Sequence, residues 1–264
     1  MMNEEQYVKP GERVDNLLTR GFRIIQSDDV FSFSIDAVLL ARFCTVPMSG
    51  RIMDLCTGNG VIPMLLATRT KAKIDAVEIQ ERLADMARRN MRMNGLEEQI
   101  HIFHADLKEA HKRFGNGKYD LVTVNPPYLP AGTGDPNINP YIAAARHELF
   151  CTLDDVMFAA SRLTRSGGKV AIVHRPSRLA DLICSMRKHR LEPKRIRFIH
   201  PRAGEEANMV LAEAIRDGRP EIRLLPPLYV FEGNQYCQEL IDIYEGKSLE
   251  LADGQNSGQT QEEE

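Results

Sequence analysis

Short apolar runs of the kind that form buried strands alternate with segments of helical periodicity along most of this chain. The strand candidates lie at 51–56, 73–79, 99–106, 119–125 and 169–174, followed by the two runs RIRFIH and MVLAEAI. Strands that alternate with helices pair in parallel through right-handed crossovers, which gives a doubly wound α/β fold. We therefore expect a mostly parallel, seven-stranded sheet.

The ends of the helical segments carry recognisable signals. Asn94-Gly95 is expected to end the helix that follows the second strand. Thr152 is an N-cap candidate for a helix that continues to Gly167-Gly168. Upstream of the sheet, FSFSIDAVLLARF reads as a strand or loop followed by a helix that packs on the sheet.

The 264 residues fit one large domain with appendages. We divide the chain into an N-terminal extension (1–48), a main domain (49–245) and a disordered acidic tail (246–264). The tail is polar and contains few apolar residues, so it cannot bury enough surface to fold.

Composition excludes several classes of protein. Five scattered cysteines without a C-x-x-C pair argue against a disulfide framework and against a metal site. The polar, acidic N-terminus does not resemble a signal peptide, and no apolar run is long enough for a membrane helix. We expect a cytoplasmic protein with no metal and no membrane partner.

The loop D-L-C-T-G-N-G lies between the first core strand and its helix. Ligands of open parallel sheets bind at the carboxyl ends of strands, where Gly58 and Gly60 let a ligand approach the backbone. Glu78 ends the next strand and can accept hydrogen bonds from ribose hydroxyls. NAD-binding folds have a carboxylate at the same spacing, so Glu78 alone does not identify the cofactor. Pro63 stands where a dinucleotide fingerprint needs glycine, and Asp54 would repel a pyrophosphate. S-adenosylmethionine is therefore favoured over NAD.

The fourth strand ends in Asn125-Pro126-Pro127-Tyr128, beside the expected cofactor loop. Prolines cannot extend a central strand, but they lock a turn in which the Asn125 side-chain carbonyl and the Pro126 main-chain carbonyl converge. Two such acceptors suit a planar NH₂ group, and Tyr128 offers a face for stacking on its ring. Positioning and polarisation of an exocyclic amine would carry the catalysis.

Together, D-x-C-T-G-N-G, V-E-I, H-A-D and N-P-P-Y resemble the Rossmann-like class I S-adenosylmethionine-dependent methyltransferases that modify exocyclic amino nitrogens. Cys56 departs from that family's pattern, which has glycine there. The resemblance implies that Glu78 binds the ribose, Asp106 the adenine, and that Asn125 to Tyr128 hold the target. The predicted cofactor site comprises Asp54, Cys56, Thr57, Gly58, Gly60, Glu78, Ile79, Asp106 and Asn125.

Further segments are similar to bacterial tRNA (adenine-N6)-methyltransferases of valine tRNA. They include G-F-R-I-I-Q, F-S-F-S-I-D-A-V-L-L-A, R-H-E at 146–148 and R-I-R-F-I-H-P-R. This resemblance implies as substrate the adenosine just 3′ of the anticodon. His147 is not assigned as a base, because the cationic amine formed by methylation is acidic enough to lose its proton to water.

A cluster of basic residues between 175 and 202 predicts an RNA-binding surface. We expect Arg195, Arg197 and Arg202 to contact phosphate groups of the RNA. A solvated helix face is the alternative. Two other substrates stay open, namely a glutamine side chain of a release factor and the N2 of guanine in ribosomal RNA. A non-catalytic RNA-binding module of the same fold is the remaining alternative.

Overall fold

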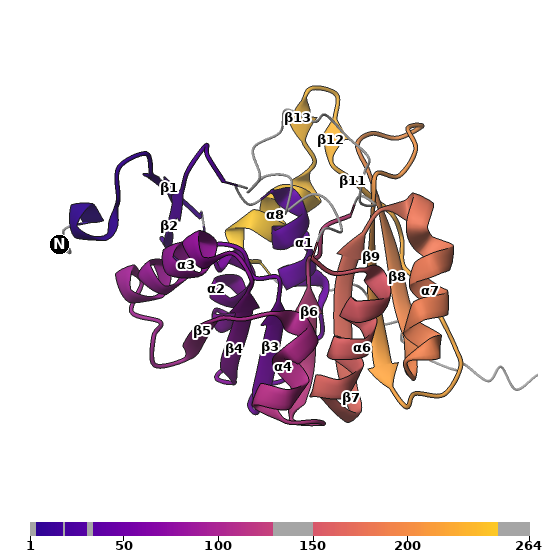
Figure 1. The fold of residues 1–264 in the computed structure, drawn as a ribbon. Coiled ribbons are helices and arrows are strands. Elements are labelled where there is room, and N and C mark those ends of the chain that lie inside the picture. The colour runs from indigo at the N-terminus through magenta and orange to yellow at the C-terminus, as the bar shows by residue number, and fades with distance from the viewer. Residues whose placement is uncertain (1–3, 18, 31–33, 129–149, 248–264) are drawn as a thin grey trace, which may run out of the picture.

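The computed structural model describes residues 4–17, 19–30, 34–128 and 150–247 (Figure 1). His147 and residues 248–264 of the expected tail lie outside them. The larger strands are β3 (Arg51–Leu55), β4 (Lys73–Glu78), β5 (Ile100–His104), β6 (Tyr119–Val124), β7 (Thr164–His174), β8 (Leu191–His200) and β9 (Met209–Arg216). The helices are α1 (Ile35–Phe43), α2 (Val61–Ala67), α3 (Glu81–Met93), α4 (Leu107–Phe114), α6 (Leu153–Leu163), α7 (Leu179–Lys188) and α8 (Gln238–Glu245), with short 3-10 turns at Glu4–Tyr7 and Pro176–Arg178.

The seven larger strands form one sheet in the order β8-β9-β7-β6-β3-β4-β5. The neighbours β7-β6-β3-β4-β5 are all parallel, whereas β9 runs antiparallel between β7 and β8. Two-residue strands, β10 (Arg223–Leu224) and β11 (Leu228–Tyr229), add to β8 and bring the sheet to nine strands. The predicted doubly wound α/β fold is confirmed, and β10 and β11 were not predicted.

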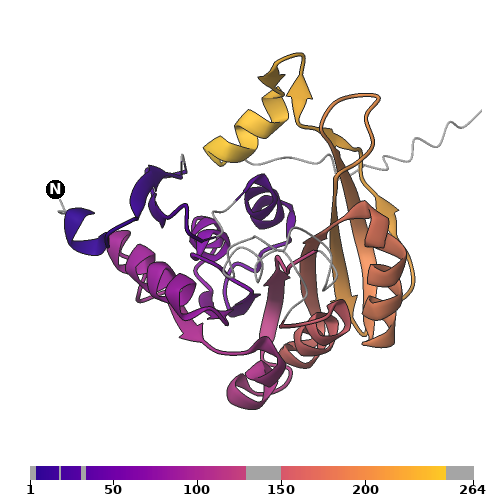
Figure 2. The ribbon, with the colours of Figure 1, turned by 45° about the horizontal axis from the view of Figure 1, so that its top comes forward.

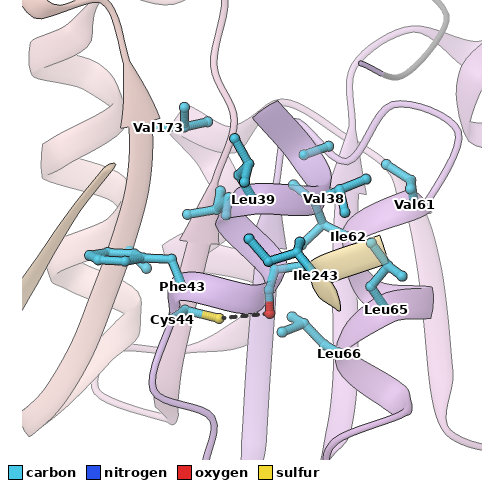
Figure 3. Packing of buried hydrophobic residues seen from close by; sticks show 14 of the residues in the cluster. Val38, Leu39, Phe43, Cys44, Val61, Ile62, Leu65, Leu66, Val173 and Ile243 are labelled. Atoms are coloured by element: carbon cyan, nitrogen blue, oxygen red, sulfur yellow. Dashed lines mark hydrogen bonds between the residues drawn. The ribbon is translucent and has the colours of Figure 1, made fainter. Parts of the chain in front are cut away.

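Helices cover both faces of the sheet (Figures 1 and 2). On one face, α1, α2 and α8 meet in an apolar core to which they contribute Val38, Leu65 and Ile243 (Figure 3). On the other face, α4, α6 and α7 pack through a second set of buried residues that includes Val156 and Leu182. The expected helix upstream of the sheet is thus α1, and it is part of the main core. Among the described residues, no helix is both long and apolar enough to span a bilayer.

The helix that starts after Thr152 is shorter than expected. Thr152 caps it as predicted, in a capping box with Asp155, but the helix ends at Leu163 and β7 begins at Thr164. Gly167, at φ 75°, does not form a helix C-cap, and the pairing of β7 with β6 shifts register between Tyr119 and Leu121. The glycine pair therefore sits in an irregular part of a strand, where positive φ is also tolerated.

A hairpin of β1 (Arg13–Asn16) and β2 (Arg23–Gln26) lies against α3. Asn90 on α3 and Asn94, the residue after its end, hold the main chain of β2. The Asn90 side chain accepts from Ile25 N at 2.8 Å, and the Asn94 side chain accepts from Arg23 N at 2.9 Å. Asn59 lies in the loop 56–60 between β3 and α2, called the glycine loop below, and its side chain donates to Ile25 O at 3.1 Å. The hairpin, α3 and the glycine loop are therefore tied together. A further small hairpin joins β12 (Phe231–Glu232) to β13 (Gln235–Tyr236).

Candidate active site

A cavity lies at the carboxyl ends of β3, β4, β5 and β6, where the fold class predicts a ligand. Its lining comes from the glycine loop, the ends of the strands, the start of α1 and the segment after β6. Predicted site residues that line it are Cys56, Thr57, Gly58, Glu78, Ile79, Asp106, Asn125, Pro126, Pro127 and Tyr128. Predicted site residues that are up to 72 positions apart in the sequence thus line one cavity.

The glycine loop is a tight turn between β3 and α2. Thr57 N donates to Val77 O at 3.0 Å, and Gly60 N donates to Thr57 O at 3.0 Å. Gly58 and Gly60 have φ values of 58° and 89°. A Cβ on Gly60 would come within 2.8 Å of Met91 Cε and 3.3 Å of Ala87 Cβ, so glycine lets α3 pack closely. Around Gly58 such an atom would meet open space, which leaves the backbone accessible to a ligand.

Cys56 occupies the position where the resembled family has glycine, and it keeps the backbone conformation that glycine favours. Its φ is 58°, in the left-handed region. A side chain there costs on the order of 1 kcal/mol. The neighbouring Cys151 thiol, together with burial, raises the pKa of Cys56 well above its usual value, so the thiol is protonated and unreactive.

Glu78 ends β4 and connects the glycine loop to the next turn. Its carboxylate accepts from Gly58 N at 2.8 Å and from Gln80 N at 2.9 Å. Burial raises the pKa of this carboxyl group, and the main-chain donors oppose that shift. Each oxygen uses one lone pair on the backbone, which leaves acceptor capacity for a ligand in the cavity.

Asp106 has two roles in the structure. Its side chain accepts from Lys108 N at 2.9 Å and so caps α4, the ordinary role of an aspartate in this position. It also lines the cavity next to Leu107. Nearby, the carbonyl of Ile79 lies 3.0 Å from His104 Nε2, which fixes the backbone at the end of β4.

Asp54 lies in β3 beneath the glycine loop and is completely buried. It is not among the described residues that line the cavity, whereas the cofactor site predicted from the sequence included it. Thr123 Oγ1 donates to Asp54 Oδ1 at 2.6 Å. Burial raises the pKa of Asp54 to about 7, an effect that the Thr123 bond partly offsets. Its role in cofactor binding stays a prediction.

The Asn125-Pro126-Pro127-Tyr128 segment follows β6 directly and faces the same cavity as Glu78 and Gly58. Pro126 is buried, and Asn125 and Tyr128 are partly accessible. The hydroxyl of Tyr128 donates to Asp36 Oδ2 at 2.6 Å and also lies within hydrogen-bond distance of the Asn125 side-chain oxygen. Burial and the nearby Asp36 carboxylate raise the pKa of Tyr128 well above its usual value, so the phenol keeps its proton.

Asp36 is a site residue that the sequence did not single out. It lies in the first turn of α1, is 4% exposed, and lines the cavity. An acid at the start of an apolar helix is ordinarily explained by favourable interaction with the helix dipole, so Asp36 did not stand out in the sequence. Its place in F-S-F-S-I-D-A was the signal that could have identified it.

The predicted RNA ligands lie in different environments. Arg197 is 5% exposed and forms a bidentate pair with Glu239, with distances of 2.8 and 3.0 Å. Arg195 pairs with the buried Glu213 at 3.3 Å and donates to Phe43 O at 2.6 Å, at the carboxyl end of α1. These contacts argue against phosphate binding by either residue. Arg202 is about half exposed and lies beyond the end of β8, at the same edge of the sheet as the cavity.

The residues of the cavity fit a nucleoside-containing cofactor. Glu78 offers carboxylate oxygens for hydroxyl groups, Gly58 an open backbone, and Ile79, Leu83 and Leu107 apolar surface for a base. In the described part of the chain, no group of three or more histidine, cysteine or acidic side chains could hold a metal ion. Fold and site together define a class I S-adenosylmethionine-dependent methyltransferase.

Residues 21–181 match the family described as methyltransferase small domain, and the chain belongs to this family. It is 33% identical over 179 residues to a tRNA1(Val) (adenine(37)-N6)-methyltransferase of Aeromonas hydrophila, an alignment that covers 67% of this chain and 73% of that protein. A protein of the same name from Parabacteroides distasonis is 30% identical over 166 residues, covering 63% and 69%.

The fold also resembles solved structures. A predicted O-methyltransferase from Agrobacterium tumefaciens superimposes with a TM-score of 0.66 at 26% identity, and the match covers 81% of this chain and 97% of that one.

Proposed function

We propose that this chain transfers a methyl group from S-adenosylmethionine to the exocyclic N6 of an adenosine in the anticodon loop of a tRNA. The carrying observation is that Asn125 to Tyr128 face the same cavity as Glu78 and Gly58. The specific target that we propose is position 37 of valine tRNA, the nucleotide in the names of the relatives from Aeromonas hydrophila and Parabacteroides distasonis. Because the proposed substrate is a tRNA, we expect the enzyme to act in the cytoplasm.

Several residues would hold the cofactor. Glu78 would accept from the ribose hydroxyls and Asp106 from the adenine amino group. Thr57, Gly58 and Asn59 would surround the rest, with Ile79 and Leu83 providing apolar contacts, whereas Gly60 is not among the residues that line the cavity. When bound, S-adenosylmethionine supplies an electrophilic methyl group on a sulfonium centre.

The chain's own contribution to the reaction is to hold the target. The Asn125 side-chain oxygen and the Pro126 carbonyl would accept the two hydrogens of the adenine NH₂ group and direct its lone pair away from the ring. Tyr128 would stack on a base turned out of the loop. After transfer, the nitrogen is cationic, and its proton leaves to water, so no side chain has to act as a base.

The exposed Arg202 and Arg175 are better placed for RNA than Arg195 or Arg197. Arg175 follows β7 at the cavity edge, and its guanidinium lies over the Tyr128 ring at 5.5 Å. A cation in this position would contact a phosphate next to a base that stacks on Tyr128.

The test is to incubate the protein with isotopically labelled S-adenosylmethionine and, in separate reactions, total tRNA, ribosomal RNA and a release factor. Mass spectrometry of the products would identify the modified group. We expect N6-methyladenosine in tRNA and, for a folded Asn125→Ala variant, loss of methylation. Label in the glutamine of the release factor or in N2-methylguanosine would assign one of the other substrates, and an Asn125→Ala variant of full activity would exclude the proposed amine-binding site.

A further inference from the structure

The hydroxyl of Tyr128 lies between the side chains of Asp36 and Asn125. Its oxygen is 2.6 Å from Asp36 Oδ2, and the side-chain oxygen of Asn125 is also within hydrogen-bond distance. The three residues come from two separate parts of the fold, because Asp36 lies in the first turn of α1 whereas Asn125 and Tyr128 follow β6. All three line the cavity.

The chemistry of this arrangement limits how the hydrogens are placed. A phenol has one hydrogen, whereas a carboxylate oxygen and an amide oxygen both only accept. The carboxylate is the stronger acceptor, because a hydrogen bond to a charged group is roughly twice as strong as a neutral one. The other oxygen of Asp36 already accepts from Ala37 N at 2.8 Å and from the Ser34 hydroxyl. Asp36 is therefore held as an acceptor and takes the Tyr128 hydrogen.

The oxygen of Tyr128 then has only lone pairs to offer to Asn125. Asn125 must therefore present its NH₂ group to Tyr128, which a half-turn of the amide about its last side-chain bond achieves. The oxygen and NH₂ ends of an amide have nearly the same size, so hydrogen bonds decide which end faces a partner. Among the described residues, the other arm of the Asn125 amide makes no hydrogen bond. Turning the amide places the carbonyl oxygen on that unoccupied arm.

We propose that Asp36 is a positioning residue: through the Tyr128 hydroxyl it fixes the Asn125 amide with its oxygen free to accept from the target amine. This inference rests on the proposed function, in which Asn125 binds that amine. Asp36 does not touch the reacting atoms. It determines which end of the amide the substrate meets.

The most informative variant is Asp36→Asn, since the new amide can donate to the Tyr128 oxygen and send the hydroxyl hydrogen to Asn125. The Asn125 amide would then turn its NH₂ group toward the target amine, so that two hydrogen-bond donors face each other. We expect the single-turnover rate of tRNA methylation, at saturating cofactor and tRNA, to fall about 10- to 100-fold, the range for an unpaired buried polar group. The dissociation constant for S-adenosylmethionine should stay within about twofold.

Tyr128→Phe supplies the matched control, because it keeps the ring and removes the hydroxyl. In this background Asp36→Asn should cause no further change in rate. An equal slowing in both backgrounds would mean that Asp36 does not act through Tyr128, and would overturn the proposal. If Asp36→Asn does not fold, as judged by thermal melting and cofactor binding, Tyr128→Phe alone decides: a rate equal to wild type refutes the coupling.

The proposed function is tested separately by Asn125→Ala in the same assay. An inactive Asn125→Ala with a fully active Asp36→Asn would reject the positioning role and leave the amine-binding site standing. A fully active Asn125→Ala would reject both.

Discussion

The imidazole of His174 meets the ring of Tyr128 edge-on, with the ring centroids 5.5 Å apart. His174 ends β7 and is 1% exposed, and neither ring nitrogen has a hydrogen-bond partner among the described residues. Burial lowers its pKa from 6.5 to about 4. A neutral histidine therefore packs edge-on against the ring that would stack on the target base.

This pKa predicts a loss of stability in acid. The unfolded chain takes up a proton near pH 6.5, whereas folded His174 resists protonation until about pH 4, so its contribution is lost as pH falls between these values. The change is about 2–3 kcal/mol by pH 4.5. His174→Phe, which keeps a ring against Tyr128, should flatten the pH dependence of the unfolding free energy in urea titrations. Equal slopes for the two proteins would show that His174 is not the responsible group.

Asp54 predicts the opposite pH dependence. Its pKa is raised from 3.8 to about 7, so the unfolded chain releases this proton first and stability falls as pH rises through that range. Asp54→Asn has no charge to bury, and we expect it to be more stable than wild type at pH 8 by on the order of 2–4 kcal/mol. The difference should shrink toward pH 4. Thermal melting across this range provides the measurement, and a pH-independent difference would contradict the assignment.

Glu78→Gln tests the carboxylate at the end of β4. The new amide would place an NH₂ group against one of two main-chain donors, Gly58 N or Gln80 N. We expect the dissociation constant for S-adenosylmethionine to rise at least tenfold in calorimetric titrations, a loss of about 1–3 kcal/mol. Glu109→Gln, on the exposed face of α4 where Glu109 pairs with Lys112, is the control and should bind normally.

Substitutions of Arg197 and Arg202 should have different effects, the first on protein stability and the second on RNA binding. Arg197→Gln breaks the bidentate pair with Glu239 and should lower the unfolding free energy by about 1–3 kcal/mol. Arg202→Gln, at an exposed position, should change stability by no more than about 0.5 kcal/mol.

For tRNA binding the expected order is reversed. Arg202→Gln should weaken binding and reduce the slope of log affinity against log salt by about 1, whereas Arg197→Gln should leave the slope unchanged. A changed slope for the folded Arg197→Gln protein alone would place the RNA on the α8 side instead.

The larger strands were predictable from the sequence because each contains a short apolar run. β7 and β8 begin five and four residues before their expected places, and the other ends of the larger strands lie within two residues of theirs. The Gly167-Gly168 pair misled the prediction, since glycine marks both a helix end and an irregular strand, and only the pairing of β7 with β6 distinguishes them. Of the candidate site, the residues next to strand ends were predictable, because the carboxyl ends of parallel strands meet at one edge of the sheet.

Contacts between distant segments could not be predicted in this way. In the sequence, Arg195 and Arg197 stand in a basic stretch with few acids near them, but Glu213 and Glu239 reach them from β9 and α8. The partner of Tyr128 is likewise 92 residues away, in α1. Local charge counts miss such pairs because folding, not sequence distance, brings the groups together.

The position of α1 limits how this catalytic unit can be recombined. Residues 49–245 contain every strand of the main sheet and the whole N-P-P-Y motif, and a sequence-based choice of a transplantable cassette would begin there. Such a cassette would omit Asp36, together with the α1 side chains that fill the core beside α2 and α8. Exchange between relatives therefore has to carry the segment upstream of β3 along with the sheet.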